Sequence, residues 1–135
     1  MYKKHISIFL LAILLFGTFS GCIDQNNNDG TNEEITATVT IDFGNGTIDT
    51  YEVKTKNNTV YDFLIQAAKK AGYDVKATYY GLYDSMFIDS IANVENGQDN
   101  KYWIYYINGE SGSVGSQKQT VENNDVIEWK FETYT

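Results

Sequence analysis

The chain has 135 residues, 10 basic and 18 acidic side chains, and a formal net charge of −8 at pH 7. This acidic balance argues against nucleic acid as a partner and against attachment to anionic membranes through basic side chains, because both need clustered positive charge. Histidine and cysteine occur once each, at His5 and Cys22. Beyond residue 22 the chain therefore cannot form a Ser-His or Cys-His nucleophilic pair, a thiolate–imidazole zinc site or a disulfide.

The first 21 residues have the layout of a secretory signal. Lys3 and Lys4 precede a run from Ile6 to Phe16 that is apolar except for Ser7, and this run is followed by a stretch of mostly small residues. Such a positive start, apolar centre and small-residue end are typical of a signal peptide. A permanent membrane-spanning helix would need roughly 20 apolar residues. We therefore predict that residues 1–21 are a cleaved signal peptide.

The stretch Phe19-Ser20-Gly21-Cys22 resembles the bacterial lipobox. The resemblance implies that Cys22 carries a lipid and holds the mature protein outside the cell membrane. The alternatives are ordinary cleavage and an uncleaved anchor. Residues 22–34 contain almost no apolar side chains after Ile23, so we predict a flexible linker. Removal of residues 1–21 takes away two lysines and no acid, which leaves eight basic and 18 acidic residues and a charge of about −10.

Residues 35–135 have the size of one small domain. Its first part predicts a β-hairpin, because Ala37, Val39, Ile41 and Phe43 alternate with polar residues. The turn residues Gly44-Asn45-Gly46 then lead into a second strand over residues 48–53.

A helix is predicted over residues 60–71. Its apolar positions recur at helical spacing and form one stripe, consisting of Val60, Phe63, Leu64, Ala67, Ala68 and Ala71. Thr59 is the expected N-cap with Asp62 three residues later, and Gly72 is the expected left-handed C-cap.

The remaining strands are expected over residues 74–80, 86–94, 101–107 and 127–131. Trp103, Tyr105 and Ile107 alternate with Tyr102, Ile104 and Tyr106, so both faces of this strand are apolar. A hairpin, one helix and further strands predict an α+β class, specifically a β-grasp-like mixed sheet packed on a single helix.

The stretch from Val60 to Tyr134 resembles the small C-terminal domain of the transcobalamin and intrinsic factor family, and the related prokaryotic domain of unknown function of the DUF4430 type. The resemblance depends on the order and spacing of several short pieces, which are Tyr80-Gly81, Asp89-Ser90-Ile91, Tyr102-Trp103, Val114-Gly115 and Asp125-Val126-Ile127.

In that family cobalamin lies between a large helical domain and this small domain, which contacts it through two segments. The resemblance therefore implies a ligand site made of Tyr80, Gly81, Met86, Phe87 and Ile88 in the first segment, and Trp103, Tyr105, Tyr106 and Gly112 in the second. This chain departs from the family by inserting residues 82–85, and by having Gly112 where an aliphatic contact is common.

The leading hypothesis is a lipid-anchored module at the cell surface that binds a corrinoid or another flat, partly apolar molecule on an aromatic platform. It requires no cofactor. Trp103 could belong either to this platform or to the core. The alternative is a non-catalytic module for protein–protein interaction, whose partner could supply the other half of the cleft.

No catalytic or metal-binding residue is predicted. The carboxylates Asp84, Asp89, Glu95 and Asp99 lie in or near expected loops of a very acidic chain and are interpreted as solvated charges. Met86 is interpreted as a packed side chain rather than as a soft metal ligand. We therefore expect that the protein is not an enzyme.

Overall fold

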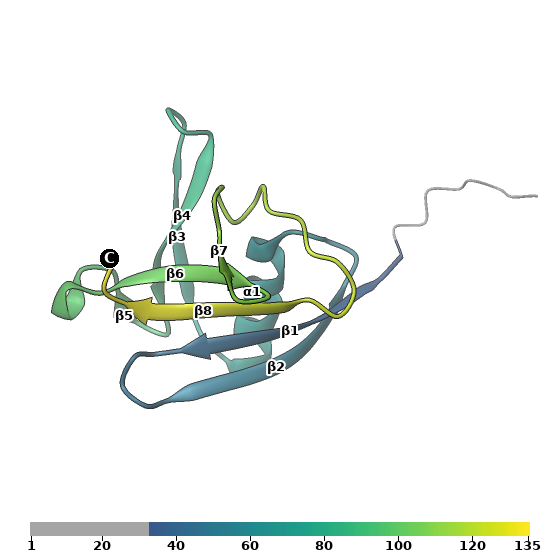
Figure 1. The fold of residues 1–135 in the computed structure, drawn as a ribbon, viewed down its shortest axis with the longest axis horizontal. Helices are drawn as coiled ribbons and strands as arrows, with labels where there is room; N and C mark the ends of the chain where they lie inside the picture. The colour runs from purple at the N-terminus through teal and green to yellow at the C-terminus, as the bar shows by residue number, and fades with distance from the viewer. Residues whose placement is uncertain (1–32) are drawn as a thin grey trace, which may run out of the picture. The chain divides into compact units, whose positions relative to one another are not determined.

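The computed structural model describes residues 33–135. The predicted signal peptide, the predicted lipid attachment at Cys22 and most of the predicted linker lie outside this range. Residues 33–135 form one compact unit with its own core (Figure 1). The elements in chain order are β1 Ile35–Asp42, β2 Ile48–Thr55, α1 Val60–Ala71, β3 Val75–Tyr80, β4 Ser85–Ile91, β5 Val94–Glu95, the short 3-10 helix η1 Gln98–Asn100, β6 Tyr102–Ile107, β7 Glu110–Ser111 and β8 Val126–Glu132.

The strands form two sheets. A five-stranded sheet has the order β2-β1-β8-β6-β7, and a three-stranded sheet has the order β3-β4-β5. The pairing of β1 with β8 is parallel, whereas the other pairs are antiparallel. The predicted α+β class is confirmed, but the strands do not share one sheet as expected.

The predicted strand over residues 86–94 is wrong in one respect, because it is two strands. β4 ends at Ile91, and Ala92 and Asn93 have positive φ angles of 49° and 64°. This left-handed backbone is incompatible with an extended strand and reverses the chain into β5. The short β5 then pairs back on β4 and not with the large sheet.

The predicted hairpin is confirmed as β1 and β2, with Ile35 opposite Thr55 and Asp42 opposite Ile48. Gly44 and Gly46 in its turn have φ angles of 66° and 93°. An added Cβ at Gly44 would lie 2.2 Å from the carbonyl oxygen of Phe131, so this turn needs glycine for space as well as for conformation.

The predicted helix is confirmed with the predicted caps. The hydroxyl of Thr59 accepts a hydrogen bond from the backbone N–H of Asp62 at 3.2 Å, and Gly72 takes the left-handed conformation after Ala71. The buried side chains of α1 are Val60, Phe63, Leu64, Ala67 and Ala68. They form the stripe that packs against the large sheet.

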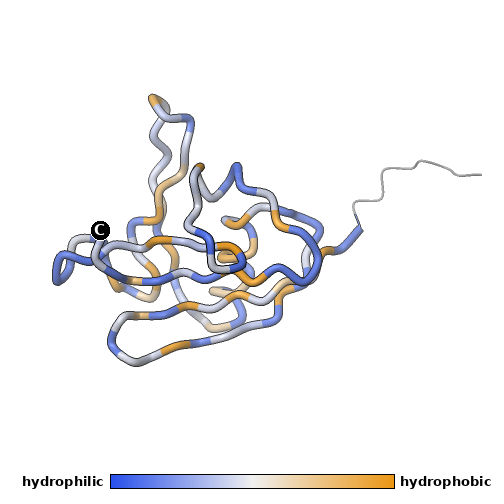
Figure 2. Tube along the Cα trace, in the orientation of Figure 1, coloured by the Kyte–Doolittle hydropathy of each residue, from blue (hydrophilic) through white to orange (hydrophobic). Residues whose placement is uncertain are grey.

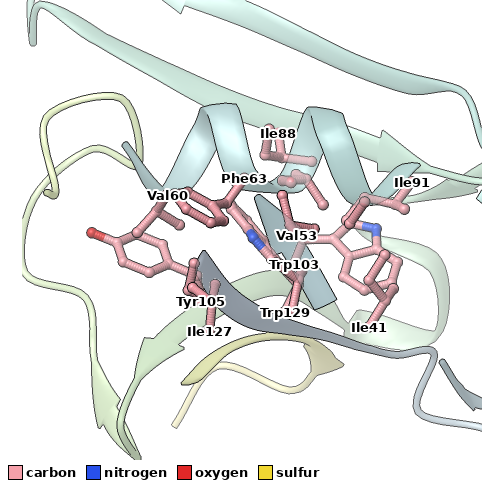
Figure 3. Close-up of a cluster of buried hydrophobic side chains, with 14 of the residues drawn as sticks. Ile41, Val53, Val60, Phe63, Ile88, Ile91, Trp103, Tyr105, Ile127 and Trp129 are labelled. Atoms are coloured by element: carbon pink, nitrogen blue, oxygen red, sulfur yellow. The ribbon is translucent and has the colours of Figure 1, made fainter. Parts of the chain in front are cut away.

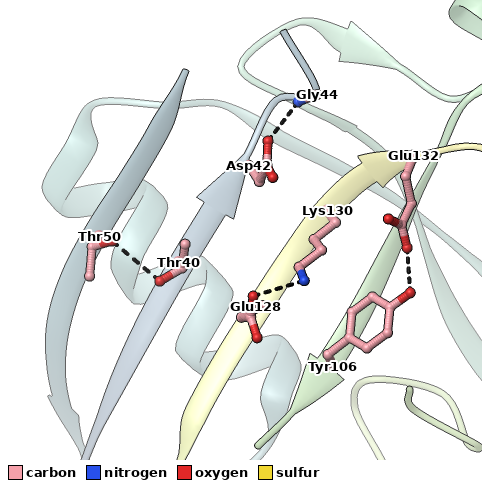
Figure 4. A network of polar contacts seen from close by, with 8 residues as sticks. All are labelled: Thr40, Asp42, Gly44, Thr50, Tyr106, Glu128, Lys130 and Glu132. Carbon is pink, nitrogen blue, oxygen red and sulfur yellow. Dashed lines mark hydrogen bonds and ion pairs between the residues drawn. The ribbon is translucent and has the colours of Figure 1, made fainter. Parts of the chain in front are cut away.

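The two faces of the large sheet differ in polarity. The face toward α1 carries the core side chains shown in Figure 3, including Ile41, Val53, Ile127 and Trp129. The opposite face carries hydrogen bonds and ion pairs, such as that between Lys130 and Glu128 at 3.0 Å (Figure 4). Strand alternation thus places one side of each strand in the core and the other in water. Among the described residues, no helix has the length and apolar character needed to span a membrane.

Candidate ligand-binding groove

A groove with a volume of about 770 Å³ is lined by β4, by β6 and by the segment that follows β7. This volume lies within the range of protein pockets for small molecules. Its lining consists of Tyr83, Ser85, Met86, Phe87, Ile88, Asn96, Tyr102, Trp103, Ile104, Tyr105, Gly112, Ser113, Val114, Gly115, Ser116, Trp129 and Tyr134. The groove therefore combines residues of both sheets with a loop between them.

The structure brings most of the predicted site residues together in this groove, namely Met86, Phe87, Ile88, Trp103, Tyr105 and Gly112. Tyr80 and Gly81 are not part of the lining, although the Tyr80 ring packs edge-on against Phe87 at 5.1 Å between centroids. Tyr106 is also absent from the lining, and its hydroxyl donates a hydrogen bond to Glu132, as Figure 4 shows. This hydrogen bond raises the pKa of Tyr106.

Trp103 belongs to the core and also lines the groove. Its side chain is 7% exposed, and its indole Nε1 donates to the carbonyl oxygen of Val94 at 2.9 Å. Its ring packs against Phe43 and Phe131, with centroid distances of 5.6 and 5.2 Å. The sequence left two roles open for Trp103, and the structure shows that it is first a packing residue.

Tyr105 forms an inner wall of the groove together with Trp129, whose ring lies 5.4 Å away between centroids. The Tyr105 hydroxyl donates to the carbonyl oxygen of Val114 at 2.5 Å, and burial raises the pKa of this hydroxyl. An added Cβ at Gly112 would lie only 2.0 Å from the Tyr105 ring. Gly112 therefore allows the loop to cross the ring closely, a role that an aliphatic residue could not fill.

The segment over residues 113–116 is a wall that the sequence analysis did not assign to the site. An added Cβ at Gly115 would lie 2.0 Å from Ser85 Oγ, so the loop touches the start of β4. Lys118 forms a 2.9 Å ion pair with Asp84, and Gln117 Nε2 donates to the Asp84 carbonyl at 3.1 Å. A hydrogen bond from Tyr79 and this ion pair hold the pKa of Asp84 below its usual value. The available sequence signal was the Val114-Gly115 pair within the family resemblance.

Asn96 joins the two sheets beside the groove. Its Nδ2 donates to the Ile88 carbonyl at 2.6 Å, and its Oδ1 accepts from the Trp103 backbone N–H at 2.8 Å. One side chain thus connects β4 to β6. The sequence indicated only a turn at Asn96-Gly97, because amide side chains and glycine are common in turns.

Comparison with known proteins identifies the family. Residues 57–133 match the model described as Domain of unknown function (DUF4430). The chain belongs to this family. No curated protein matches the chain significantly.

Two solved structures share the fold of the DUF4430 domain. A "putative metal binding protein" from Ruminococcus gnavus aligns with a TM-score of 0.60 and 19% identity, over 76% of this chain and 100% of its own. Haptocorrin in complex with Cbi aligns with a TM-score of 0.68 and 17% identity, over 84% of this chain. The chain spans only 29% of the haptocorrin chain. The predicted resemblance to the transcobalamin family is therefore confirmed at the level of the fold.

Among the described residues, those that line the DUF4430 groove include no Asp, Glu, Lys, Arg or His. Its polar groups are hydroxyls, amides, indoles and backbone atoms, and most of its side chains are aromatic or aliphatic. Within residues 33–135, no group of three or more His, Cys, Asp or Glu side chains could hold a metal ion. The arrangement can provide stacking, apolar contact and neutral hydrogen bonds.

Proposed function

We propose that this DUF4430 domain is a non-catalytic ligand-binding module that takes a flat, partly apolar molecule of the corrinoid type in its groove. The observation that carries the proposal is the groove itself, whose aromatic and uncharged lining draws on both sheets. Large apolar rings and a few neutral polar groups suit a ligand of that kind. The lipid on Cys22 would hold the module outside the cell membrane.

The fold supports the proposal as an analogy. A mixed five-stranded sheet covered by one helix fits the β-grasp interpretation. The haptocorrin structure with the same fold was determined with Cbi. A fold alone does not establish function. The support specific to this chain is the groove, because six of the residues carried over from the family line it.

A second candidate function is docking of a partner protein on the β3–β4 hairpin. The tip of this hairpin exposes large apolar side chains, with Leu82 89% exposed and Tyr83 66% exposed. Figure 2 shows the hydrophobic residue at the tip, and Figure 1 shows the hairpin extending away from the large sheet. Exposed apolar patches of this kind commonly mark interaction sites. Since Tyr83 also lines the groove, a partner bound there could close the groove over a ligand.

The test is calorimetric titration of residues 31–135 with cobinamide and with cobalamin. We expect saturable binding in the micromolar range or tighter. Phe87→Ala should weaken it by about tenfold, because a half-exposed ring that lines the groove is lost. Ile48→Ala is the matched control, because Ile48 is an exposed apolar residue of β2 that does not line the groove.

If neither corrinoid binds at concentrations up to millimolar, the result would contradict the proposal that this domain binds corrinoids without a partner protein. Equal weakening by the Phe87 and Ile48 substitutions would place the ligand outside the groove. Without any binding, the docking function would become the leading candidate.

A further inference from the structure

We infer that the tip of the β3–β4 hairpin inserts into the interfacial region of the lipid bilayer beside which the domain is held. This hairpin tip consists of residues 79–83 and of Phe87, whose ring packs on it. The inference goes beyond the groove ligand and takes from the proposed function only the attachment through Cys22. Exposed apolar area, low local charge and the length of the tether support it.

The hairpin tip carries a cluster of exposed apolar side chains. Among the described residues, five of the ten large hydrophobic side chains that are exposed lie within residues 79–87. They are not scattered, because the rings of Tyr80 and Tyr83 pack against Phe87 with centroid distances of 5.1 and 6.5 Å. Leu82 is the most exposed of the five. A connected apolar patch of this kind marks a contact surface, whereas single exposed side chains do not.

The cluster lies on a projecting hairpin and not on a flat face. Figure 1 shows β3 and β4 extending away from the large sheet. A narrow projection can enter a bilayer interface while the rest of the acidic domain stays in water. Tyrosine suits this depth, because its ring is apolar and its hydroxyl can remain among the polar headgroups.

The local charge of the hairpin also fits a lipid surface. Residues 77–88 contain a single charged side chain, Asp84, in a chain whose formal net charge is −8. The Asp84 carboxylate forms a 2.9 Å ion pair with Lys118. The hairpin therefore carries no uncompensated charge toward the bilayer. The acidic remainder of the domain is repelled by anionic lipids, so the expected surface is zwitterionic.

The attachment point favours lipid over a protein as the occupant of the hairpin tip. Ten residues, 23–32, separate Cys22 from the first described residue, Glu33. A chain of this length spans at most roughly 40 Å, which is comparable to the diameter of a small domain, about 30 Å. The hairpin can therefore turn toward the membrane but cannot leave its vicinity. Such a tether makes insertion an intramolecular event, for which a modest affinity is sufficient.

The test uses Cys22 as a chemical attachment point, because it is the only cysteine of the chain. Residues 22–135 are coupled through the Cys22 thiol to a maleimide lipid in phosphatidylcholine vesicles. The coupling makes the result independent of whether the cell attaches a lipid to Cys22. Insertion is measured as quenching of tryptophan fluorescence by brominated lipid chains. The native Trp103 and Trp129 are buried, so the unsubstituted protein supplies a constant background.

Leu82→Trp is the probe of insertion. Its added fluorescence should shift to shorter wavelength on the vesicles and should be quenched by the brominated chains. Ile48→Trp is the matched control, because Ile48 is an exposed apolar residue of β2, outside the hairpin. It should show neither change. Equal quenching of the two variants, or quenching of neither, would overturn the inference and leave the hairpin tip to the protein partner of the second candidate function.

Two further measurements test the physical cause of insertion. Addition of Tyr83→Asp to Leu82→Trp should abolish the quenching, because a carboxylate at the hairpin tip opposes entry into lipid. Replacement of phosphatidylcholine by phosphatidylglycerol should reduce the quenching of Leu82→Trp, and added salt should restore it by screening the repulsion. Quenching that survives Tyr83→Asp, or that increases on the anionic vesicles, would overturn the inference. Neither measurement involves cobinamide, so the inference and the proposed groove function can fail separately.

Discussion

Two aromatic clusters of this domain have similar chemistry and different surroundings. Trp103 and Phe131 pack 5.2 Å apart on the face of the large sheet that α1 covers, and both are buried. Tyr80 and Phe87 pack 5.1 Å apart on the β3–β4 hairpin, and both are about half exposed. Aromatic residues of strands therefore become core or exposed surface according to what covers them. The predictions below test this difference.

The largest effect is expected for Trp103→Ala. Truncation of a buried tryptophan leaves a cavity and should lower the free energy of unfolding by about 3–5 kcal/mol. It also removes the donor to the Val94 carbonyl. Urea unfolding followed by circular dichroism measures the loss. A decrease below about 1 kcal/mol would show that Trp103 is not a core residue.

A matched pair of phenylalanines sharpens the comparison. Phe131→Ala should cost about 3–5 kcal/mol of unfolding free energy, because this ring is buried in the core. Phe87→Ala should cost about 1 kcal/mol, because its ring is 49% exposed. The difference between the two urea midpoints is the measurement. Equal costs would mean that the hairpin cluster is packed as firmly as the core.

Asn96→Ala should loosen the connection between the sheets. The substitution leaves the Ile88 carbonyl and the Trp103 N–H without their side-chain partner, which should cost about 1–3 kcal/mol. Amide hydrogen exchange should become faster at Trp103. Asn57→Ala is the control at an exposed asparagine. Unchanged exchange at Trp103 would contradict the connecting role of Asn96.

The smallest effect is expected at alkaline pH. The Tyr73 hydroxyl donates to the Asp49 carboxylate, and this hydrogen bond, with burial and the carboxylate charge adding to it, raises the pKa of Tyr73 to about 12. An ordinary tyrosine has a pKa of about 10. The folded state therefore holds this proton more tightly than the unfolded state. The resulting stabilisation is complete below about pH 10 and is lost as the pH rises toward 12.

Tyr73→Phe should make the free energy of unfolding fall less steeply between about pH 10 and 12. The slope should not vanish, because the pKa values of Tyr79, Tyr105 and Tyr106 are also raised. Urea unfolding at a series of pH values measures it. An identical slope in wild type and variant would show that Tyr73 does not contribute.

Several elements were predictable because local interactions determine them. Thr59 and Gly72 bound the helix as expected, since capping and left-handed termination depend on a few neighbouring residues. The alternation of Val39 and Ile41 likewise predicted the buried face of β1. The break after Ile91 was not predicted, because Ala92 is not a residue that favours positive φ.

The groove was predicted in part. The family resemblance pointed to Met86, Phe87 and Tyr105, which the structure places in the lining. The resemblance did not separate Tyr106 from the residues that line the groove. The Tyr106 side chain forms its hydrogen bond on the opposite face of β6. The resemblance also did not single out Asn96, whose role depends on atoms that other segments of the chain supply.

The sequence by itself determined the α+β class, the helix with its caps and the first hairpin. These features follow from residue spacing and from turn chemistry over a few positions. Only the tertiary structure decided that the strands divide into two sheets, that Trp103 is buried whereas Phe87 is half exposed, and that a loop tied to Asp84 forms a wall of the groove. The physical reason is that these features arise from contacts between residues far apart in the chain, which no local pattern encodes.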